Sequence, residues 1–153
     1  MRYRPYIPAD FPALYAIEEV CFQPPFRFGH RYMRRLADSP HTITWIAEED
    51  GQMAGFAIAD YGPGRAGIAA YIQTIEVLPQ MRGLGIGGEL LSRIDDSARD
   101  KGAQTIWLHV DSQNGSAIRL YESHGYVGQG RKENYYPQGR AALIYTKQLK
   151  SGS

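Results

Sequence analysis

The sequence predicts a single α/β domain with a central mixed, mostly antiparallel sheet of about six to seven strands, flanked by about four helices. An apolar, β-branched run at residues 71–77 indicates a strand, and a glycine-rich turn connects it to a long helical pattern. Alternating runs at residues 43–48 and 53–61 are joined by Asp50-Gly51, a strong hairpin signal. After one more short helix, the end of the chain returns to strand patterns. Strands and helices in this order are expected to pack as layers on one sheet.

Composition indicates one globular domain over residues 1–150, with residues 151–153 as a disordered tail. The formal net charge of +1 gives no reason to expect nucleic acid or a membrane as a partner. No apolar run is long enough to span a bilayer, and the first residues lack the apolar core of a signal peptide, so we expect a cytoplasmic protein. The single cysteine, Cys21, excludes an internal disulfide framework, and no spacing of ligand side chains indicates a metal site. The protein is expected to be a monomer or a homodimer.

The other elements follow from periodicity and from residues that start or stop helices. Asp10 is the expected N-cap of the first helix, and paired prolines end that helix in an aromatic loop at residues 22–28. The apolar face of the first helix would consist of Leu14, Ile17, Val20 and Cys21. In chain order we expect a strand at residues 2–7, the first helix, a second helix at 30–37, the two hairpin strands, a loop at 62–67, the strand at 71–77, a long helix ending near Gly102, a strand at 105–110, a helix at 114–124, and strands at 126–134 and 141–148.

The glycine-rich turn has the features of an anion-binding site. It leads into the first turn of a helix, where backbone N–H groups have no intrahelical partners and the helix dipole adds positive charge. Glycines let a ligand approach that backbone without a Cβ in the way, and Arg82 adds a full positive charge. The turn therefore predicts a phosphate or pyrophosphate site. Its candidate residues are Arg82, Gly83, Leu84, Gly85, Ile86, Gly87 and Gly88.

Two motifs compete for this turn. Gly83, Gly85 and Gly88 satisfy the G-x-G-x-x-G dinucleotide pattern, but five residues separate it from its strand and little chain remains for a second nucleotide-binding half. The alternative, Arg82-x-x-Gly85-x-Gly87, resembles the R/Q-x-x-G-x-G/A signature of the GNAT acetyltransferases, whose loop binds the pyrophosphate of acetyl-CoA. A turn without a ligand ranks third, because glycines at the start of a helix weaken the helix.

The order of elements resembles the GNAT fold over essentially the whole chain. The second half is similar to the protein N-terminal (Nα) acetyltransferases of the RimI and NatE catalytic-subunit types. The segments that carry this resemblance are Trp107-Leu108-His109-Val110, Asn114-x-Ser116-Ala117-Ile118-x-x-Tyr121-Glu122-x-x-Gly125-Tyr126 and Asn134-Tyr135-Tyr136-Pro137. In this subgroup the last segment covers the peptide N-terminus, so it is the most specific signal. The resemblance implies acetyl-CoA as the co-substrate and a peptide or protein N-terminus as the acceptor.

The resemblance also implies catalytic residues. RimI-like enzymes carry a glutamate general base at the position of His109, whereas NatE-type subunits have a histidine paired with a tyrosine on the central strand. Tyr71 falls at the spacing of that tyrosine before Gly85. Histidine titrates near ~6.5, so His109 would accept a proton through a water held by Tyr71, and Tyr121 would protonate the CoA sulfur. The structural alternatives are a hydrogen-bonded core histidine and a core tyrosine.

Binding residues are implied in the same way. Backbone groups of Ile75 and Val77 would pair with the pantetheine arm like a missing strand, and Asn114 with Ser116 would contact the cofactor from the next helix. The acceptor groove would lie between two aromatic segments. The predicted wall residues of this groove are Phe22, Pro24, Phe26, Tyr135 and Tyr136.

Three classes of function share the cofactor features. The first is an N-acetyltransferase that acts on the α-amine of a protein or peptide N-terminus. The second is an acetyltransferase for small amines such as polyamines, aminoglycosides or amino acids. The third is a module that binds acetyl-CoA without turnover, and the set Tyr71, His109 and Tyr121 argues against it.

Overall fold

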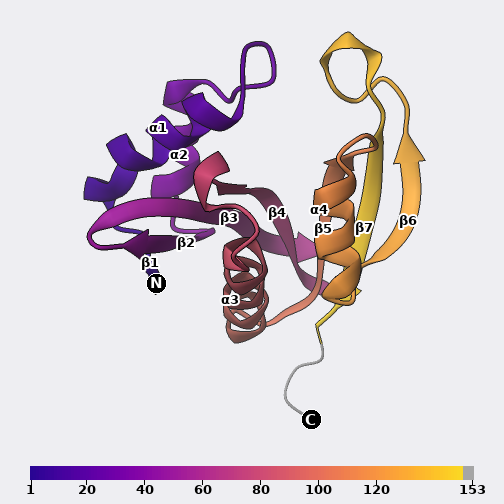
Figure 1. Cartoon of the computed structure of the whole chain (residues 1–153). Helices are drawn as coiled ribbons and strands as arrows, with labels where there is room; N and C mark the ends of the chain where they lie inside the picture. Colours follow the sequence, from indigo (N-terminus) through magenta and orange to yellow (C-terminus); the bar gives the residue numbers. More distant parts are fainter. Residues whose placement is uncertain (150–153) are drawn as a thin grey trace.

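The computed structural model describes residues 1–149 and has seven strands and four helices on one sheet, as the sequence predicts (Figure 1). The elements are β1 (Arg2–Pro5), α1 (Phe11–Cys21), α2 (His30–Asp38), β2 (Thr42–Glu49), β3 (Gln52–Gly64), β4 (Gly67–Val77), α3 (Ile86–Asp100), β5 (Ala103–Asp111), α4 (Gly115–Ser123), β6 (Val127–Lys132) and β7 (Ala142–Gln148). None of these helices is long and apolar enough to cross a membrane. The predicted tail at residues 151–153 lies outside the described residues.

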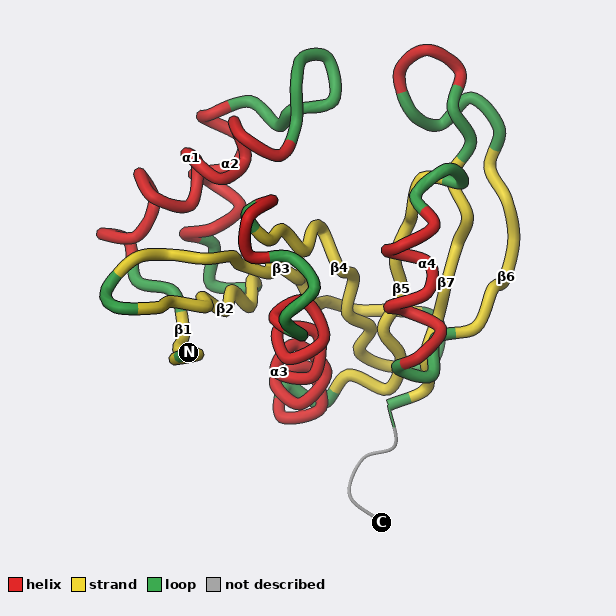
Figure 2. Tube along the Cα trace, in the orientation of Figure 1, coloured by secondary structure: helices red, strands yellow, loops and turns green. Residues whose placement is uncertain are grey.

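The sheet has the strand order β1-β2-β3-β4-β5-β7-β6 (Figure 2). Neighbouring strands are antiparallel except for β4 and β5, which run parallel. A parallel pair needs a crossover connection, and α3 supplies it. The turn between β4 and α3 therefore lies at the end of β4, where the sequence places the anion site.

Helices cover both faces of the sheet (Figure 1). On one face α1 and α2 pack on the first strands, and on the other face α3 packs on the central strands with α4 beside it. Both helical layers bury apolar stripes at the spacing that an amphipathic helix requires. The fully buried residues of α3 are Leu90, Leu91, Ile94 and Ala98, and the core beneath α1 includes Phe11, Leu14, Ile17, Met33 and Phe56.

The two central strands separate partway along their length. β5 pairs with β4 only along residues 68–72 of β4, although β4 continues to Val77. On the other side of β4, Ile58 pairs with Thr74 while its neighbour Ala59 pairs with Ile72, so Gln73 is an extra residue in the ladder. Such a bulge bends a strand and disrupts its pairing. Beyond it, β4 and β5 lead away from each other (Figure 2).

Two turns between strands differ in how well the sequence predicts them. The hairpin at Asp50 and Gly51 is confirmed, with φ of 51° and 77° at the two residues. The expected loop at residues 62–67 is wrong, because β3 runs to Gly64 and β4 begins at Gly67. The two strands pair up to these ends, so a two-residue connection satisfies backbone groups that a longer loop would leave exposed.

Two expectations for α1 are corrected. The Asp10 carboxylate does not cap α1; it accepts hydrogen bonds from the Ile7 N–H and from Arg4, each at 2.8 Å, and Arg4 lowers its pKa. Val20 is 53% exposed, so it does not belong to the buried face. Glu18 lies in the buried stripe instead, because its carboxylate binds the loop that follows α1.

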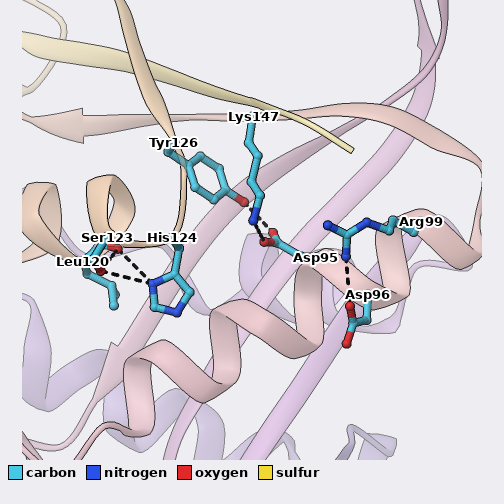
Figure 3. Close-up of polar contacts among 8 residues, drawn as sticks. All are labelled: Asp95, Asp96, Arg99, Leu120, Ser123, His124, Tyr126 and Lys147. Atoms are coloured by element: carbon cyan, nitrogen blue, oxygen red, sulfur yellow. Dashed lines mark hydrogen bonds and ion pairs between the residues drawn. The ribbon is translucent and has the colours of Figure 1, made fainter. Parts of the chain in front are cut away.

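A buried carboxylate on α3 connects this helix to the residue before β6 and to β7 (Figure 3). Asp95 on α3 is 3% exposed. Its carboxylate accepts a hydrogen bond of 2.6 Å from the Tyr126 hydroxyl and forms an ion pair with Lys147 Nζ on β7 at 2.8 Å. This contact fixes α3 to the strands on the far side of the split. Its neighbour Asp96 is exposed and forms an ion pair with Arg99, one turn along the same helix.

Asp95→Ala should lower the free energy of unfolding by roughly 2–4 kcal/mol, because it leaves a partly buried lysine and a buried hydroxyl without their partner. Urea unfolding would measure the loss. The matched control is Asp96→Ala, which removes an exposed pair and should change stability by no more than about 0.5 kcal/mol. Equal effects of the two substitutions would contradict a structural role for Asp95.

Candidate active site

The predicted catalytic pair meets where β4 and β5 begin to separate. The Tyr71 hydroxyl oxygen lies 2.8 Å from His109 Nδ1. Tyr71 is opposite Trp107 in the parallel ladder, and His109 follows Trp107 on the same face of β5, so strand register alone brings the pair together. The sequence suggested a water held by Tyr71 as the link to His109, whereas the two side chains are in direct contact.

Aromatic rings enclose His109. The Tyr135 ring is stacked on the imidazole with centroids 4.3 Å apart and planes at 13°, and Trp107 packs against its edge at 5.3 Å. Burial, with a smaller effect from Lys132, lowers the pKa of His109, so the imidazole is neutral at neutral pH. Burial and then Tyr135 raise the pKa of Tyr71, so its hydroxyl keeps its proton. The neutral hydroxyl can therefore donate its hydrogen bond to Nδ1.

Tyr121 lies on α4 and is 7% exposed. Its ring packs against Tyr126 with centroids 5.7 Å apart, as expected for a core tyrosine. Burial and then Tyr136 raise its pKa, so the hydroxyl is protonated. Within residues 1–149 no protein group forms a hydrogen bond with this hydroxyl. The residue can therefore be a core aromatic and still have a proton to donate.

The glycines of the turn have two different functions. Gly83 and Gly85 both have φ of 82°, which only glycine adopts readily, and a Cβ on either would meet no atom within 4 Å. Gly85 is the N-cap of α3, and the first N–H groups of a helix have no intrahelical partners and suit an anion. Gly87 and Gly88 instead pack against α4, since a Cβ would come within 3.4 Å and 3.2 Å of its side chains. The turn thus fits a phosphate group, and the helix behind it is held in place.

Arg82 is oriented differently from the expectation. Its Nε donates to the Val77 carbonyl oxygen at 3.0 Å, and Nη2 lies 3.6 Å from Cys21 Sγ. The guanidinium thus ties the turn back to α1 and the end of β4. The Val77 carbonyl, a predicted partner of the cofactor, is already engaged by Arg82 and by the Cys21 thiol at 3.7 Å.

Asn114 caps α4 as the sequence predicts. Its side-chain oxygen accepts a hydrogen bond from the Ala117 N–H at 3.2 Å, and Ser116 Oγ lies 3.4 Å from the same oxygen. The amide nitrogen of Asn114 is not used in this cap, so it remains a possible donor to a ligand. Both Asn114 and Ser116 are exposed.

The two predicted aromatic walls rise from the same end of the molecule, as the loop after α1 and the loop between β6 and β7 (Figure 1). They touch: the Arg140 guanidinium carbon lies 5.0 Å from the centroid of the Phe26 ring. Arg140 also pairs with Asp111 at the end of β5. Tyr135 and Tyr136 pack edge-to-face at 4.9 Å on the same side. The sequence analysis did not single out Arg140, and no local pattern indicates this contact.

Phe22 and Pro24, the other two predicted wall residues, are exposed in the loop after α1. The Phe28 N–H donates a hydrogen bond to Glu18 Oε2 at 2.9 Å, and this bond anchors the backbone of the loop to α1.

A pair of buried glutamates lies beneath the loop after α1. Glu18 is 0% exposed and Glu76 is 3% exposed, and each has one carboxylate oxygen without a partner among the described residues. Thr74 donates to the other oxygen of Glu76 at 2.8 Å. Burial and then the proximity of Glu18 raise the pKa of Glu76, so Glu76 keeps its proton at pH values at which an exposed glutamate has lost it. The signal that the sequence analysis overlooked is a charged residue one helical turn after Leu14, on an apolar face.

The geometry agrees with the comparison to known families. The model of the acetyltransferase (GNAT) family matches residues 11–126. The chain belongs to this family. It is therefore an acetyltransferase, and the prediction that it uses acetyl-CoA as its co-substrate is confirmed. Within the part of the chain that the structure describes, no cluster of three or more His, Cys, Asp or Glu side chains could hold a metal ion.

Two of the similar proteins are named for different kinds of acceptor, a ribosomal protein and streptothricin. The [ribosomal protein bS18]-alanine N-acetyltransferase of Haemophilus influenzae is 33% identical over 129 residues, which are 84% of this chain and 83% of the relative. The crystal structure of the Escherichia coli ribosomal-protein-S18-alanine N-acetyltransferase has a TM-score of 0.86 and 26% identity, and the match covers 99% of this chain and 96% of that chain. The streptothricin acetyltransferase of Streptomyces lavendulae is 39% identical over 93 residues, 61% of this chain and 48% of the relative.

Glu76→Gln should make the stability of the protein less dependent on pH. Because the pKa of Glu76 is raised in the folded state, its contribution is fully present below the pKa of unfolded glutamate, about 4.3, and is lost as pH rises through the folded pKa. Wild type should therefore lose stability relative to the variant as pH is raised from about 5 to alkaline values, in urea unfolding at a series of pH values. Glu19→Gln, an exposed neighbour of Glu18, should follow wild type. Parallel curves for wild type and Glu76→Gln would show that the pKa of Glu76 is not raised in the folded state.

Gly85→Val should weaken acetyl-CoA binding by roughly tenfold or more, a loss of about 1.4 kcal/mol or more, because a side chain would enter the open side of the turn. Titration calorimetry would measure the affinity. The control is Gly51→Val in the distant hairpin, where φ is 77° and a Cβ also meets open space. It introduces the same backbone strain and should leave affinity unchanged. An unchanged affinity in Gly85→Val, or tighter binding of NAD than of CoA, would remove this turn as the cofactor site.

Proposed function

We propose that the protein transfers the acetyl group of acetyl-CoA to the α-amine of a protein or peptide N-terminus. The observation that supports this most is the contact between the two aromatic walls, Phe26 with Arg140, beside the Tyr71–His109 pair. The acceptor of the Haemophilus influenzae relative, the N-terminal region of a ribosomal protein, belongs to the same chemical class. The proposal includes a cytoplasmic location.

In this proposal the cofactor lies along the opening between β4 and β5. When bound, acetyl-CoA supplies a thioester whose carbonyl carbon is attacked by the amine and whose sulfur leaves. Free N–H groups at residues 83–88 bind the pyrophosphate. Backbone groups of Ile75 and Val77 face the pantetheine arm, and Asn114 and Ser116 contact it from α4. Since the Val77 carbonyl already has two partners, the pairing depends more on its neighbours than the sequence suggested.

Tyr71 and His109 remove a proton from the acceptor amine. The Tyr71 oxygen accepts that proton while its own hydroxyl proton passes to His109 Nδ1, so the charge moves to the imidazole and no charged tyrosine persists. The direct contact of 2.8 Å makes this transfer possible without an intervening water. An α-amine titrates near ~8, so a histidine that is neutral at physiological pH is an adequate base.

Tyr121 completes the reaction on the other side of the opening. As the amine nitrogen bonds to the acetyl carbon and the carbon–sulfur bond breaks, the sulfur takes the Tyr121 hydroxyl proton. The raised pKa of Tyr121 ensures that this proton is present at neutral pH. Its low exposure also excludes water from competing as the donor.

The walls favour an α-amine over a lysine side chain. Because Arg140 joins the two walls at Phe26, we expect them to accept a backbone terminus and its first side chain more readily than a long side chain. A lysine ε-amine titrates about two pKa units higher than an α-amine and would demand a stronger base. By analogy with the NatE-type histidine, we expect Met or another apolar first residue to be preferred over alanine.

The main alternative is a small amine as acceptor. The Streptomyces lavendulae relative, a streptothricin acetyltransferase, supports it, although this chain spans only about half of that protein. A module without turnover is the weaker alternative, since the Tyr71–His109 contact and the protonated Tyr121 form a complete acid–base set.

The test uses matched peptides with a free or a blocked N-terminus, each with one internal lysine. Wild type should acetylate only the free N-terminus, and His109→Ala should lower that rate by roughly 10²-fold with acetyl-CoA affinity nearly intact, the usual effect of losing a general base. Mass spectrometry would locate the acetyl group. His41→Ala, an exposed histidine at the start of β2, is the control and should retain full activity. Equal acetylation of both peptides, or activity on polyamines alone, would exclude the N-terminal acceptor.

A further inference from the structure

Lys132 lies on the same face of the sheet as His109. In the ladder His109 is opposite Ile144 of β7, and Ile144 is opposite Gly130 of β6. Residues opposite each other share a face, and so do residues two apart along a strand. Lys132, two residues after Gly130 and opposite Ala142, therefore points to the side where His109 lies.

Small residues leave room on this face for Tyr135 to fold back. A Cβ on Gly130 would meet no atom within 4 Å. The Tyr135 ring lies flat on the His109 imidazole at 4.3 Å, and the Lys132 ammonium nitrogen lies 5.7 Å from the centroid of the same ring. The Tyr135 ring thus contacts both the imidazole and the ammonium group.

The two carboxylates near the Tyr71–His109 pair have partners of their own. Asp111, on the same face of β5, is paired with Arg140 from the segment before β7. Asp60 on β3, near Tyr71, accepts a hydrogen bond from Gln73 at 3.2 Å. Tyr135 and Tyr136 also pack on this side, and burial raises the pKa of Tyr136 to about 12.

Lys132 itself is not neutralised. Its neighbours Arg131 and Glu133 pair with each other. Within residues 1–149, none of the ion pairs involves Lys132. It is therefore the one unbalanced cation in this group of side chains around His109.

We propose that Lys132 is a positioning residue for acetyl transfer, whose ammonium group, together with the Tyr135 ring, keeps the His109 imidazole uncharged and oriented toward Tyr71. This inference rests on the proposed function of His109 as the base. A nearby cation raises the free energy of an imidazolium more than that of a neutral imidazole. The charge of Lys132 acts in the same direction as burial on the pKa of His109.

The effect matters because only the neutral imidazole can accept a proton. Without Lys132 a larger fraction of His109 would be protonated in mildly acidic solution, and Tyr71 would lose the acceptor of its hydroxyl proton. The cation also contributes to holding Tyr135 on the imidazole, since an ammonium group is attracted to the face of an aromatic ring.

The experiment measures the pKa of His109 directly by NMR and, separately, the pH dependence of kcat/KM on the free-terminus peptide. In Lys132→Met the His109 titration and the acidic limb should both move to higher pH. At about pH 6 the variant should therefore lose roughly two- to threefold more activity than at about pH 8, the size of effect that one charge near 10 Å gives at intermediate dielectric. Lys132→Arg should restore the wild-type profile, since it restores the charge.

Arg131→Met is the matched control, because it removes a cation one residue away that is paired with Glu133. It should leave the His109 titration unchanged. Raising the salt concentration should move the wild-type titration toward that of Lys132→Met and leave the variant almost unaffected, since salt screens exposed charges. A purely structural role of Lys132 would not produce this salt dependence.

The outcomes separate the two proposals. If the His109 titration is the same in wild type and Lys132→Met, the inference about Lys132 is wrong whatever the activity. If the titration moves but the acidic limb does not, Lys132 acts on His109 as proposed, and His109 is not the base. If Lys132→Arg behaves like Lys132→Met, charge is not the cause and the inference is overturned.

Discussion

The separation of β4 from β5 is the constraint on which the site depends. An extra residue, Gln73, interrupts the ladder just after Ile72, the last residue that pairs with β5. The strands are close enough before this point to bring Tyr71 and His109 into contact. After it, they are far enough apart to leave backbone edges unpaired along a line that leads to the glycine turn. One local distortion thus arranges the Tyr71–His109 contact, the proposed path of the cofactor and the proposed anion site in sequence along β4.

The site is built from groups that remain uncharged where water is excluded. Burial raises the pKa values of Tyr71 and Tyr121 and lowers that of His109, so each is neutral before reaction. The raised pKa of Glu76 beside Glu18 avoids two buried negative charges. Burying charged groups without partners would be costly, and a low-dielectric site strengthens the hydrogen bonds that neutral groups form with one another. The charged groups beside the site lie at its edge, where Asp111 pairs with Arg140 and Lys132 is exposed.

The parts of the fold that the sequence predicts correctly have local causes. Asp50-Gly51 determines a tight hairpin by its backbone preferences, and Asn114 caps α4 with its own side chain. The parts that it does not predict depend on distant contacts. The bulge at Gln73 follows from how three strands pair, and no residue type there signals it. Glu18 did give a signal, as a charged residue in an apolar stripe, but its partner lies on another element, so only the fold reveals the pair.

Family membership does not identify the acceptor, because the features shared by the family lie on the sheet and α3 while the acceptor walls lie on loops. The acid–base pair and the anion site belong to the sheet and α3, which packing holds rigidly, whereas the acceptor walls are two loops from distant parts of the chain. Their contact, Arg140 on Phe26, is of a kind worth about 0.5–1 kcal/mol at an exposed site. An acceptor that forms even one good hydrogen bond with the walls can replace it. Under the proposed function, the residues at the tips of these loops, and not Tyr71 and His109, would therefore select the amine.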